Sequence, residues 1–279
     1  ITVTAGSIKL GETGTLASTV SMSGGTLDAD ETLTLSGALT QSGDITIDVA
    51  TGKTLTYSGA SLSLGAYTLT LSGEGRLSNT NDLVLNNADS KLLLSSSITV
   101  DSVSTSLASL GLDVDDDSTV TSLTVAHTTP VSIASGKTLS GAITVTAGSI
   151  KLGETGTLAS TVSMSGGTLD ADNSSTVSGA LSQSGNTTID VADGKTLTYS
   201  GAAVSLGAYT LTMSGGGTLS NTNAFVLNNA SSKLLLSSSI TVDSVSTSAD
   251  SLGFDVDNDS TVTSLAIAHT TPVSIASGK

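Results

Sequence analysis

The stretch Ile47-Asp-Val-Ala-Thr-Gly-Lys-Thr-Leu55 alternates apolar and polar residues on both sides of a Gly-Lys pair. Alternation over four or five residues is typical of a half-buried β-strand. A glycine between two such runs favours a tight turn in which the glycine has a positive φ. The same pattern returns at residues 131–139 and 189–197. The stretch therefore predicts strand, turn and strand, and its recurrence predicts a structure built from similar turns of chain.

The spacing of the three copies gives the size of one turn of chain. Lys53, Lys137 and Lys195 occupy the same place in the pattern, and they are separated by 84 and 58 residues. These separations are close to four and three coils of ~20 residues, within the range of known structural repeats. We therefore expect about seven coils in 142 residues. With stacked strands ~4.8 Å apart, seven coils would rise ~34 Å.

A much longer repeat contains this recurring strand–turn–strand pattern. Residues 1–137 align without a gap on residues 143–279, and 22 of the 137 aligned positions differ. The first 30 pairs are identical, and residues 138–142 have no second copy. Near-identical units at a fixed period indicate a tandem repeat protein. We predict two repeat units, 1–142 and 143–279, in which the second is a truncated copy continuous with the first and the chain is an excerpt of a longer array.

The fold class follows from the strand signals between these landmarks. Short alternating runs end at Gly, Asn, Ser or Asp, and the spacers between them are too short for helices. The sequence predicts an all-β, right-handed parallel β-solenoid, with Leu, Ile, Val and Ala inside and Ser and Thr outside. A tandem array of β-sandwiches is the alternative. Four Tyr, two Phe and no Trp provide little of the aromatic core that a sandwich generally uses.

Composition excludes several classes of function. Nine basic residues against 24 acidic ones give a net charge of −15, so the chain lacks the basic surface that nucleic acid requires. No apolar stretch approaches 18 residues, so we expect no membrane span. The chain has no Cys, which excludes disulfides, thiolate metal sites and a Cys nucleophile.

Enzymatic motifs are absent from the sequence. A phosphate-binding loop needs Gly where Ile47 stands, five positions before Gly52, and the segment that follows reads as a strand instead of a helix. His127 and His269 are equivalent residues, and no Gly-x-Ser-x-Gly motif accompanies them. We expect no enzyme activity and no required cofactor.

An acidic run is the candidate metal site. Asp at alternate positions of an extended segment points to one side, and a hard cation such as Ca²⁺ relieves the repulsion between such carboxylates. The run has neither the Gly nor the final Glu of a calcium loop, so a solvated acidic turn is the alternative. The candidate ligands are Asp113, Asp115, Asp117, Asp255, Asp257 and Asp259.

A family resemblance accompanies these motifs. The phrase Val-x-Ile-Ala-x-Gly-Lys-Thr-Leu at 131–139, the Thr-Leu-Thr-Leu-Ser-Gly runs at 32–37 and 68–73, and the long repeats resemble those of large bacterial surface proteins. These include β-helical adhesins similar to filamentous haemagglutinin and autotransporter passengers. The resemblance implies an extracellular β-solenoid stalk, fibre or adhesive filament, without shared catalytic residues.

These observations together predict a structural role. A solenoid end is an unpaired sheet edge, so we expect the chain to continue into more repeats or to stack on copies of itself. Divalent cations bridging acidic surfaces could bundle neighbouring rods. Two alternatives stay open: an adhesin segment whose ligand-binding tip is encoded elsewhere, and an ice-binding solenoid. The second is suggested by Thr-x-Thr pairs at 2/4, 32/34, 68/70 and 144/146.

Overall fold

The computed structural model describes residues 1–153 and 155–278, and this part of the chain contains strands and no helix. The chain folds as two compact units, Ile1–Ala142 and Ile143–Lys279. The strand pairs within each unit are parallel. Parallel pairing between strands about 20 residues apart is that of a β-solenoid, so the predicted fold is confirmed. The alternative of a tandem β-sandwich array is wrong, because sandwich sheets are antiparallel.

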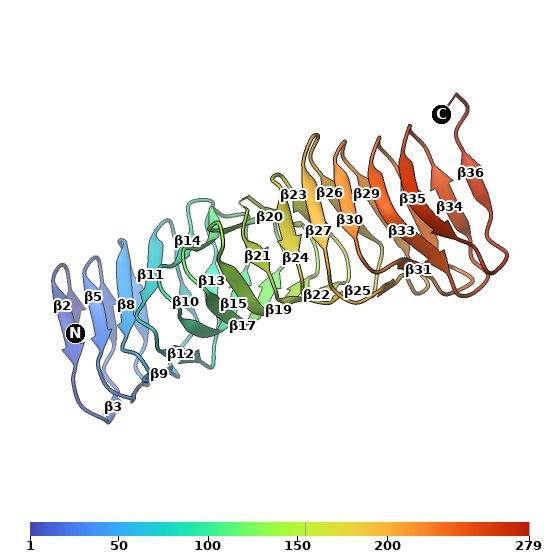
Figure 1. The fold of residues 1–279 in the computed structure, drawn as a ribbon. Helices are drawn as coiled ribbons and strands as arrows, with labels where there is room; N and C mark the ends of the chain where they lie inside the picture. The colour runs from blue at the N-terminus through green and yellow to red at the C-terminus, as the bar shows by residue number, and fades with distance from the viewer. Residues whose placement is uncertain (154, 279) are drawn as a thin grey trace. The chain divides into compact units, whose positions relative to one another are not determined.

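The strands of each coil form three faces of unit 1. Figure 1 shows the first strands of face 1 side by side in the blue part of the chain. Face 1 consists of β2 (Ser7–Leu10), β5 (Thr26–Ala29), β8 (Ile45–Val49), β11 (Thr68–Ser72), β14 (Lys91–Leu94), β16 (Gly111–Val114) and β18 (Thr129–Ile133).

Faces 2 and 3 of unit 1 complete each coil, and β15 (Thr99–Thr105) and β17 (Ser118–Val125) bend so that each contributes to both faces. Face 2 also contains β3 (Thr15–Leu16), β6 (Leu33–Leu35), β9 (Thr54–Tyr57) and β12 (Arg76–Asn79). Face 3 also contains β1 (Thr2–Val3), β4 (Val20–Met22), β7 (Leu39–Gln41), β10 (Leu62–Ser63) and β13 (Leu83–Leu85). The unit boundary falls inside β19 (Thr138–Val145).

Unit 2 repeats this arrangement. Its face 1 consists of β20 (Ser149–Leu152), β23 (Thr168–Ala171), β26 (Thr187–Val191), β29 (Thr210–Ser214), β32 (Lys233–Leu236), β34 (Gly253–Val256) and β36 (Val273–Ile275). Its face 2 contains β21 (Thr157–Leu158), β24 (Ser175–Val177), β27 (Thr196–Tyr199) and β30 (Thr218–Asn221). Its face 3 contains β22 (Thr161–Met164), β25 (Leu181–Gln183), β28 (Val204–Ser205) and β31 (Phe225–Leu227). Two longer strands contribute to both face 2 and face 3, namely β33 (Thr241–Thr247) and β35 (Thr261–Ala266).

The strand count agrees with the spacing of the Gly-Lys turns. Among the described residues, face 1 has seven strands in each unit, which corresponds to seven coils per unit. The glycine of the turn motif has the positive φ that the sequence predicts, with values of 71° at Gly52, 74° at Gly136 and 67° at Gly194. In each turn the lysine N–H donates to the carbonyl three residues earlier, as from Lys53 to Ala50 over 2.9 Å. The period-2 pattern and one turn glycine thus define the coil.

The core is a set of apolar columns, one residue per coil. Strict alternation places every second side chain inside, and parallel register stacks like on like. On face 1 of unit 1 the inner column is Ile8, Leu27, Ile47, Leu71, Leu94, Val114 and Ile133. The spacing along this column varies between 19 and 24 residues, because the corner loops differ in length.

Candidate functional site

The acidic run of unit 1 lies where β16 leads into β17. Its carboxylates bind separate partners. Asp113 forms an ion pair with Lys91 on the neighbouring strand β14. The Asp116 carboxylate lies 2.6 Å from the Lys137 ammonium, whose hydrogen bond holds the pKa of Asp116 below its usual range. Asp117 accepts a hydrogen bond from the Thr138 N–H over 2.7 Å. Asp113 therefore joins its coil to the preceding one, Asp116 and Asp117 join it to the following one, and Asp115 is exposed.

The equivalent acidic run of unit 2 lies where β34 leads into β35. Asp255 lies 2.6 Å from Lys233, and the amide of Asn258, which replaces Asp116, donates to the Ser237 carbonyl over 2.7 Å. Asp257 and Asp259 are exposed. The described residues of the chain contain no group of three or more His, Cys, Asp or Glu that could hold a metal ion. The structure thus does not gather Asp113, Asp115 and Asp117, or their counterparts, around one point, and calcium binding there stays a prediction.

Ion pairs on face 1 connect successive coils near the start of each unit. The Lys9 ammonium lies 2.5 Å from Asp30 and 3.7 Å from Asp28, and the hydrogen bond from Lys9 lowers the pKa of Asp30. Burial and the neighbouring charge of Asp30 raise the pKa of Asp28. In unit 2, Lys151 is within 3.2 Å of Asp170, and burial is the main cause that raises the pKa of Asp170.

Buried asparagines form a second set of inter-coil contacts, which the sequence analysis did not identify. The Asn79 amide donates to the carbonyls of Asn81 (3.0 Å) and Ser102 (2.6 Å). Its side-chain oxygen accepts the N–H groups of Asp101 (3.1 Å) and Ser102 (3.2 Å). Asn79 is 4% exposed, and Asn221 repeats the arrangement in unit 2. Each amide therefore forms hydrogen bonds that join its own coil to the backbone of the next coil.

A column made mostly of threonine lies on face 2 of each unit. In unit 2 one outward column is threonine in four successive coils, at Thr196, Thr218, Thr241 and Thr261. In unit 1 the equivalent column contains one arginine, and it reads Thr54, Arg76, Thr99 and Thr119. Beside it, Asp101 accepts hydrogen bonds from Arg76, while its counterpart Asp243 is bound by the Ser220 hydroxyl over 2.8 Å. Unit 2 therefore has the more uniform hydroxyl surface.

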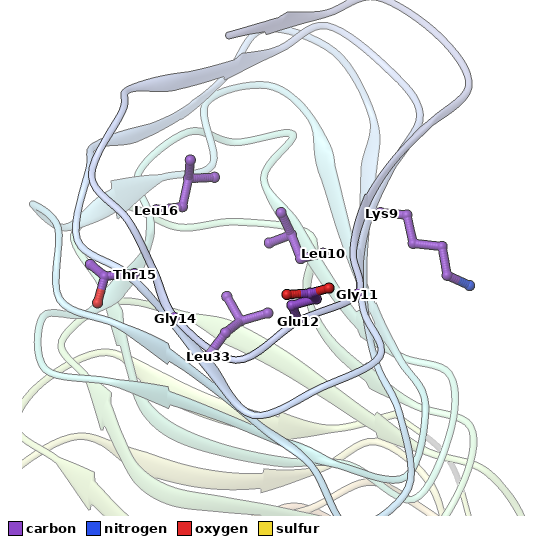
Figure 2. Close-up of a pocket in the computed structure, with 8 residues that line it drawn as sticks. All are labelled: Lys9, Leu10, Gly11, Glu12, Gly14, Thr15, Leu16 and Leu33. Carbon is purple, nitrogen blue, oxygen red and sulfur yellow. The ribbon is translucent and has the colours of Figure 1, made fainter.

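A pocket opens into the first coil of unit 1. It encloses ~340 Å³, and Figure 2 shows Leu10, Leu16 and Leu33 directed into it while Lys9 points away. The Glu12 side chain lies next to Leu10 in this view and also lines the pocket. The lining mixes three apolar side chains with backbone and one carboxylate, and it is wide open to solvent.

Comparisons with known proteins identify no relative. Neither the protein-family models, nor the curated proteins, nor the solved structures give a match to the chain. The part of the chain that the structure describes contains no helix long and apolar enough to cross a membrane. The parallel sheets agree with the family resemblance of the motifs as far as a repeat-rich β-solenoid.

Proposed function

We propose that the chain is a structural module of an extracellular fibre, filament or cell-surface stalk, stiffened by stacked β-coils. The observation that carries the proposal is the unbroken inter-coil bonding within each unit. Every coil shares backbone ladders, apolar columns and side-chain bonds with its neighbours, as at Asn79 and Asn221. A solenoid of this kind resists bending because each coil contacts the next over its whole outline.

Surface chemistry supports the same role. The outward residues are chiefly Ser, Thr and Asp, and the net charge is −15, so like-charged rods repel one another and stay soluble. The exposed ion pairs contribute little stability each. They do join residues of neighbouring coils, for example Glu31 with Lys53 over 2.6 Å. The extracellular location is inferred from the family resemblance of the repeats.

Electron microscopy of arrays of one, two and four 142-residue units tests the proposal. If units stack coil on coil, the particles are straight and lengthen by ~34 Å per added unit, which is seven coils at ~4.8 Å. Particles that bend freely at fixed intervals, or whose length does not scale with the number of units, would contradict a stiffening role. Repeating the measurement with and without Ca²⁺ tests the predicted bridging of rods at the same time.

A second candidate function, ice binding, is favoured by the threonine column Thr196–Thr261 of unit 2. Regularly spaced hydroxyl and methyl groups on a flat sheet can order water in ice-like rows, and parallel strands space them ~4.8 Å apart. Inhibition of ice recrystallisation by the parent chain is the expected result. Thr218→Arg introduces the arginine that unit 1 has at the equivalent position, Arg76, and should weaken the inhibition of ice recrystallisation. Thr212→Arg on face 1 should leave that inhibition unchanged. Absence of inhibition in the parent chain would rule this candidate out.

A further inference from the structure

A column of charged residues runs along face 1 of each unit. In unit 2, on strands β20, β23, β26 and β29 (Figure 1), the column consists of Lys151, Asp170, Asp190 and Ser214. In unit 1 the same register stacks Lys9, Asp28, Asp48 and Ser72. None of these residues differs between the units, so a stacked pair of aspartates occurs once in each unit.

Charges surround Asp170 on both neighbouring coils and on its own coil. The Lys151 ammonium lies 3.2 Å from Asp170 and 3.1 Å from Asp172, so one base serves two carboxylates. Asp190 lies opposite Asp170 on the next coil, and its carboxylate accepts a hydrogen bond from the Ser214 hydroxyl. Strands are ~4.8 Å apart, so like charges directly opposite each other repel. Among the described residues, this cluster contains three carboxylates and one ammonium.

Asp170 is also largely shielded from solvent. Its side chain is 15% exposed, whereas that of Asp172 is 50% exposed. Burial is the main cause that raises the pKa of Asp170, and the charges of Asp172 and Asp190 add to it. The hydrogen bond from Lys151 opposes this rise in pKa without cancelling it. Burial and two neighbouring carboxylates raise the pKa of Asp28 in unit 1 in the same way, as expected of a carboxylate that loses water and faces like charges.

We propose that Asp28 and Asp170 are acid-responsive contacts between coils, which repel the next coil at neutral pH and bond to it in mild acid. The proton comes from solvent and binds one oxygen of the central carboxylate. The resulting O–H group can donate to a neighbouring carboxylate, so a half-buried charge is removed and repulsion is replaced by a hydrogen bond. No covalent bond forms or breaks. Each unit therefore gains a contact between coils as its surroundings become acidic.

The folded chain binds this proton more tightly than the unfolded chain does. Protonation of Asp170 therefore favours the folded state, and its contribution to stability grows as the pH falls through the raised pKa. The contribution is complete below the unfolded pKa, near ~3.9, and absent above the raised pKa. Asp30 behaves in the opposite way, because the hydrogen bond from Lys9 lowers its pKa. Two aspartates that share one lysine, Asp28 and Asp30, should thus respond to acid with opposite signs.

Denaturant unfolding of the 279-residue chain between about pH 7 and about pH 3 tests the proposal. Asp170→Asn keeps the shape of the side chain and is neutral throughout this range. Its unfolding equilibrium constant should be about two- to fivefold below that of the parent chain at neutral pH, because the repulsion between opposite carboxylates is gone. This advantage should disappear in acid, where the parent chain has taken up its proton. A ratio of the two constants that does not change with pH would overturn the inference.

Two variants of unit 1 supply the matched control. Asp28→Asn should behave as Asp170→Asn does. Asp30→Asn should be less stable than the parent chain at neutral pH and equal to it in acid, because it loses the bond to Lys9. The same sign for Asp28→Asn and Asp30→Asn would overturn the inference, because net charge would then govern the response instead of the position in the column.

A carbon-detected NMR titration of the Asp170 carboxyl separates the effect of the next coil from that of burial. In the chain with Asp190→Asn, the titration midpoint of Asp170 should move to lower pH than in the parent chain, because an opposing charge is removed. An unchanged midpoint would overturn the contact between coils, since burial alone would then hold the proton. The contact lies within one unit, so its test does not depend on the proposed structural function.

Discussion

Units 1 and 2 form a natural comparison, because the same coil arrangement is built from two sequences that differ at 22 of 137 positions. In one place two core residues that are neighbours in register have both changed. The registered pair Leu62 and Leu83 becomes Val204 and Phe225, so one side chain shrinks as the other grows. At this layer the two units therefore keep a similar total side-chain volume, which is the kind of exchange that cores tolerate best.

Glycines at close backbone approaches should show the largest effects, equal in the two units. Gly73 has φ of 80°, and a Cβ there would lie 2.0 Å from the Val49 carbonyl oxygen. Gly215 has φ of 88°, and the corresponding distance to Val191 is 1.9 Å. Substitution by Ala combines backbone strain with a backbone clash, and should lower the free energy of unfolding by about 3 kcal/mol or more at either site. Denaturant unfolding measures it.

The turn glycine is the matched control for that prediction. Gly52 also has a positive φ, but a Cβ there would meet no atom within 4 Å. Gly52→Ala should therefore cost only about 1–2 kcal/mol. If all these alanine variants lose the same stability, then close stacking of the coils is not what requires Gly73 and Gly215.

The compensated core pair predicts a strong coupling. Leu83→Phe alone overpacks the layer against Leu62 and should cost about 1–3 kcal/mol. Adding Leu62→Val recreates the combination of unit 2 and should recover most of the loss. A double-mutant cycle measured by denaturant unfolding gives the coupling energy, expected at about 0.5–3 kcal/mol. Additive effects would mean that the two exchanges are independent.

A half-buried glutamine distinguishes the units by its hydrogen bonds. Gln183 donates to the Leu206 carbonyl and accepts from the Thr187 hydroxyl, both at 2.8 Å. In unit 1 Ile45 replaces that threonine, and the buried Gln41 side-chain oxygen has no hydrogen-bond partner among the described residues. Gln183→Met should cost about 1–3 kcal/mol, whereas Gln41→Met should be neutral or stabilising. Equal costs by denaturant unfolding would contradict this difference.

The smallest effect concerns the ion pair that only unit 1 has. The hydrogen bond from Lys137 lowers the pKa of Asp116 below its value in the unfolded chain, near ~3.9. The pair therefore adds stability above that pH and loses it as the pH falls through the lowered pKa. Asp116→Asn, which copies Asn258 of unit 2, should be slightly less stable than the parent at pH 7, and the difference should vanish in acid. Thermal unfolding at several pH values measures it.

The sequence predicts the coil and its periodicity better than the contacts between coils. Alternation, the glycine of the Gly52 turn and the 142-residue period suffice for a seven-coil solenoid, because each is a local or repeated signal. The ion pair of Asp113 with Lys91 and the buried amide of Asn79 depend on register between coils. That register is set by corner loops whose lengths vary, so no fixed spacing in the sequence predicts which residues of neighbouring coils are paired.

The dependence on register between coils also explains why the candidate metal ligands do not gather around one point. Alternation predicts that Asp113, Asp115 and Asp117 share one side of an extended segment, but the bases and N–H groups of neighbouring coils decide where each carboxylate binds.

The proposed stiffening role requires the coils to stack along the long axis of the rod. Diffraction from oriented arrays of four units tests this most directly, because it reports the direction of coil stacking. Stacked coils predict a strong reflection near ~4.8 Å along the long axis of the particles. A reflection of that spacing perpendicular to the long axis, or none at all, would mean that the coils do not build the length of the rod and that its stiffness has another source.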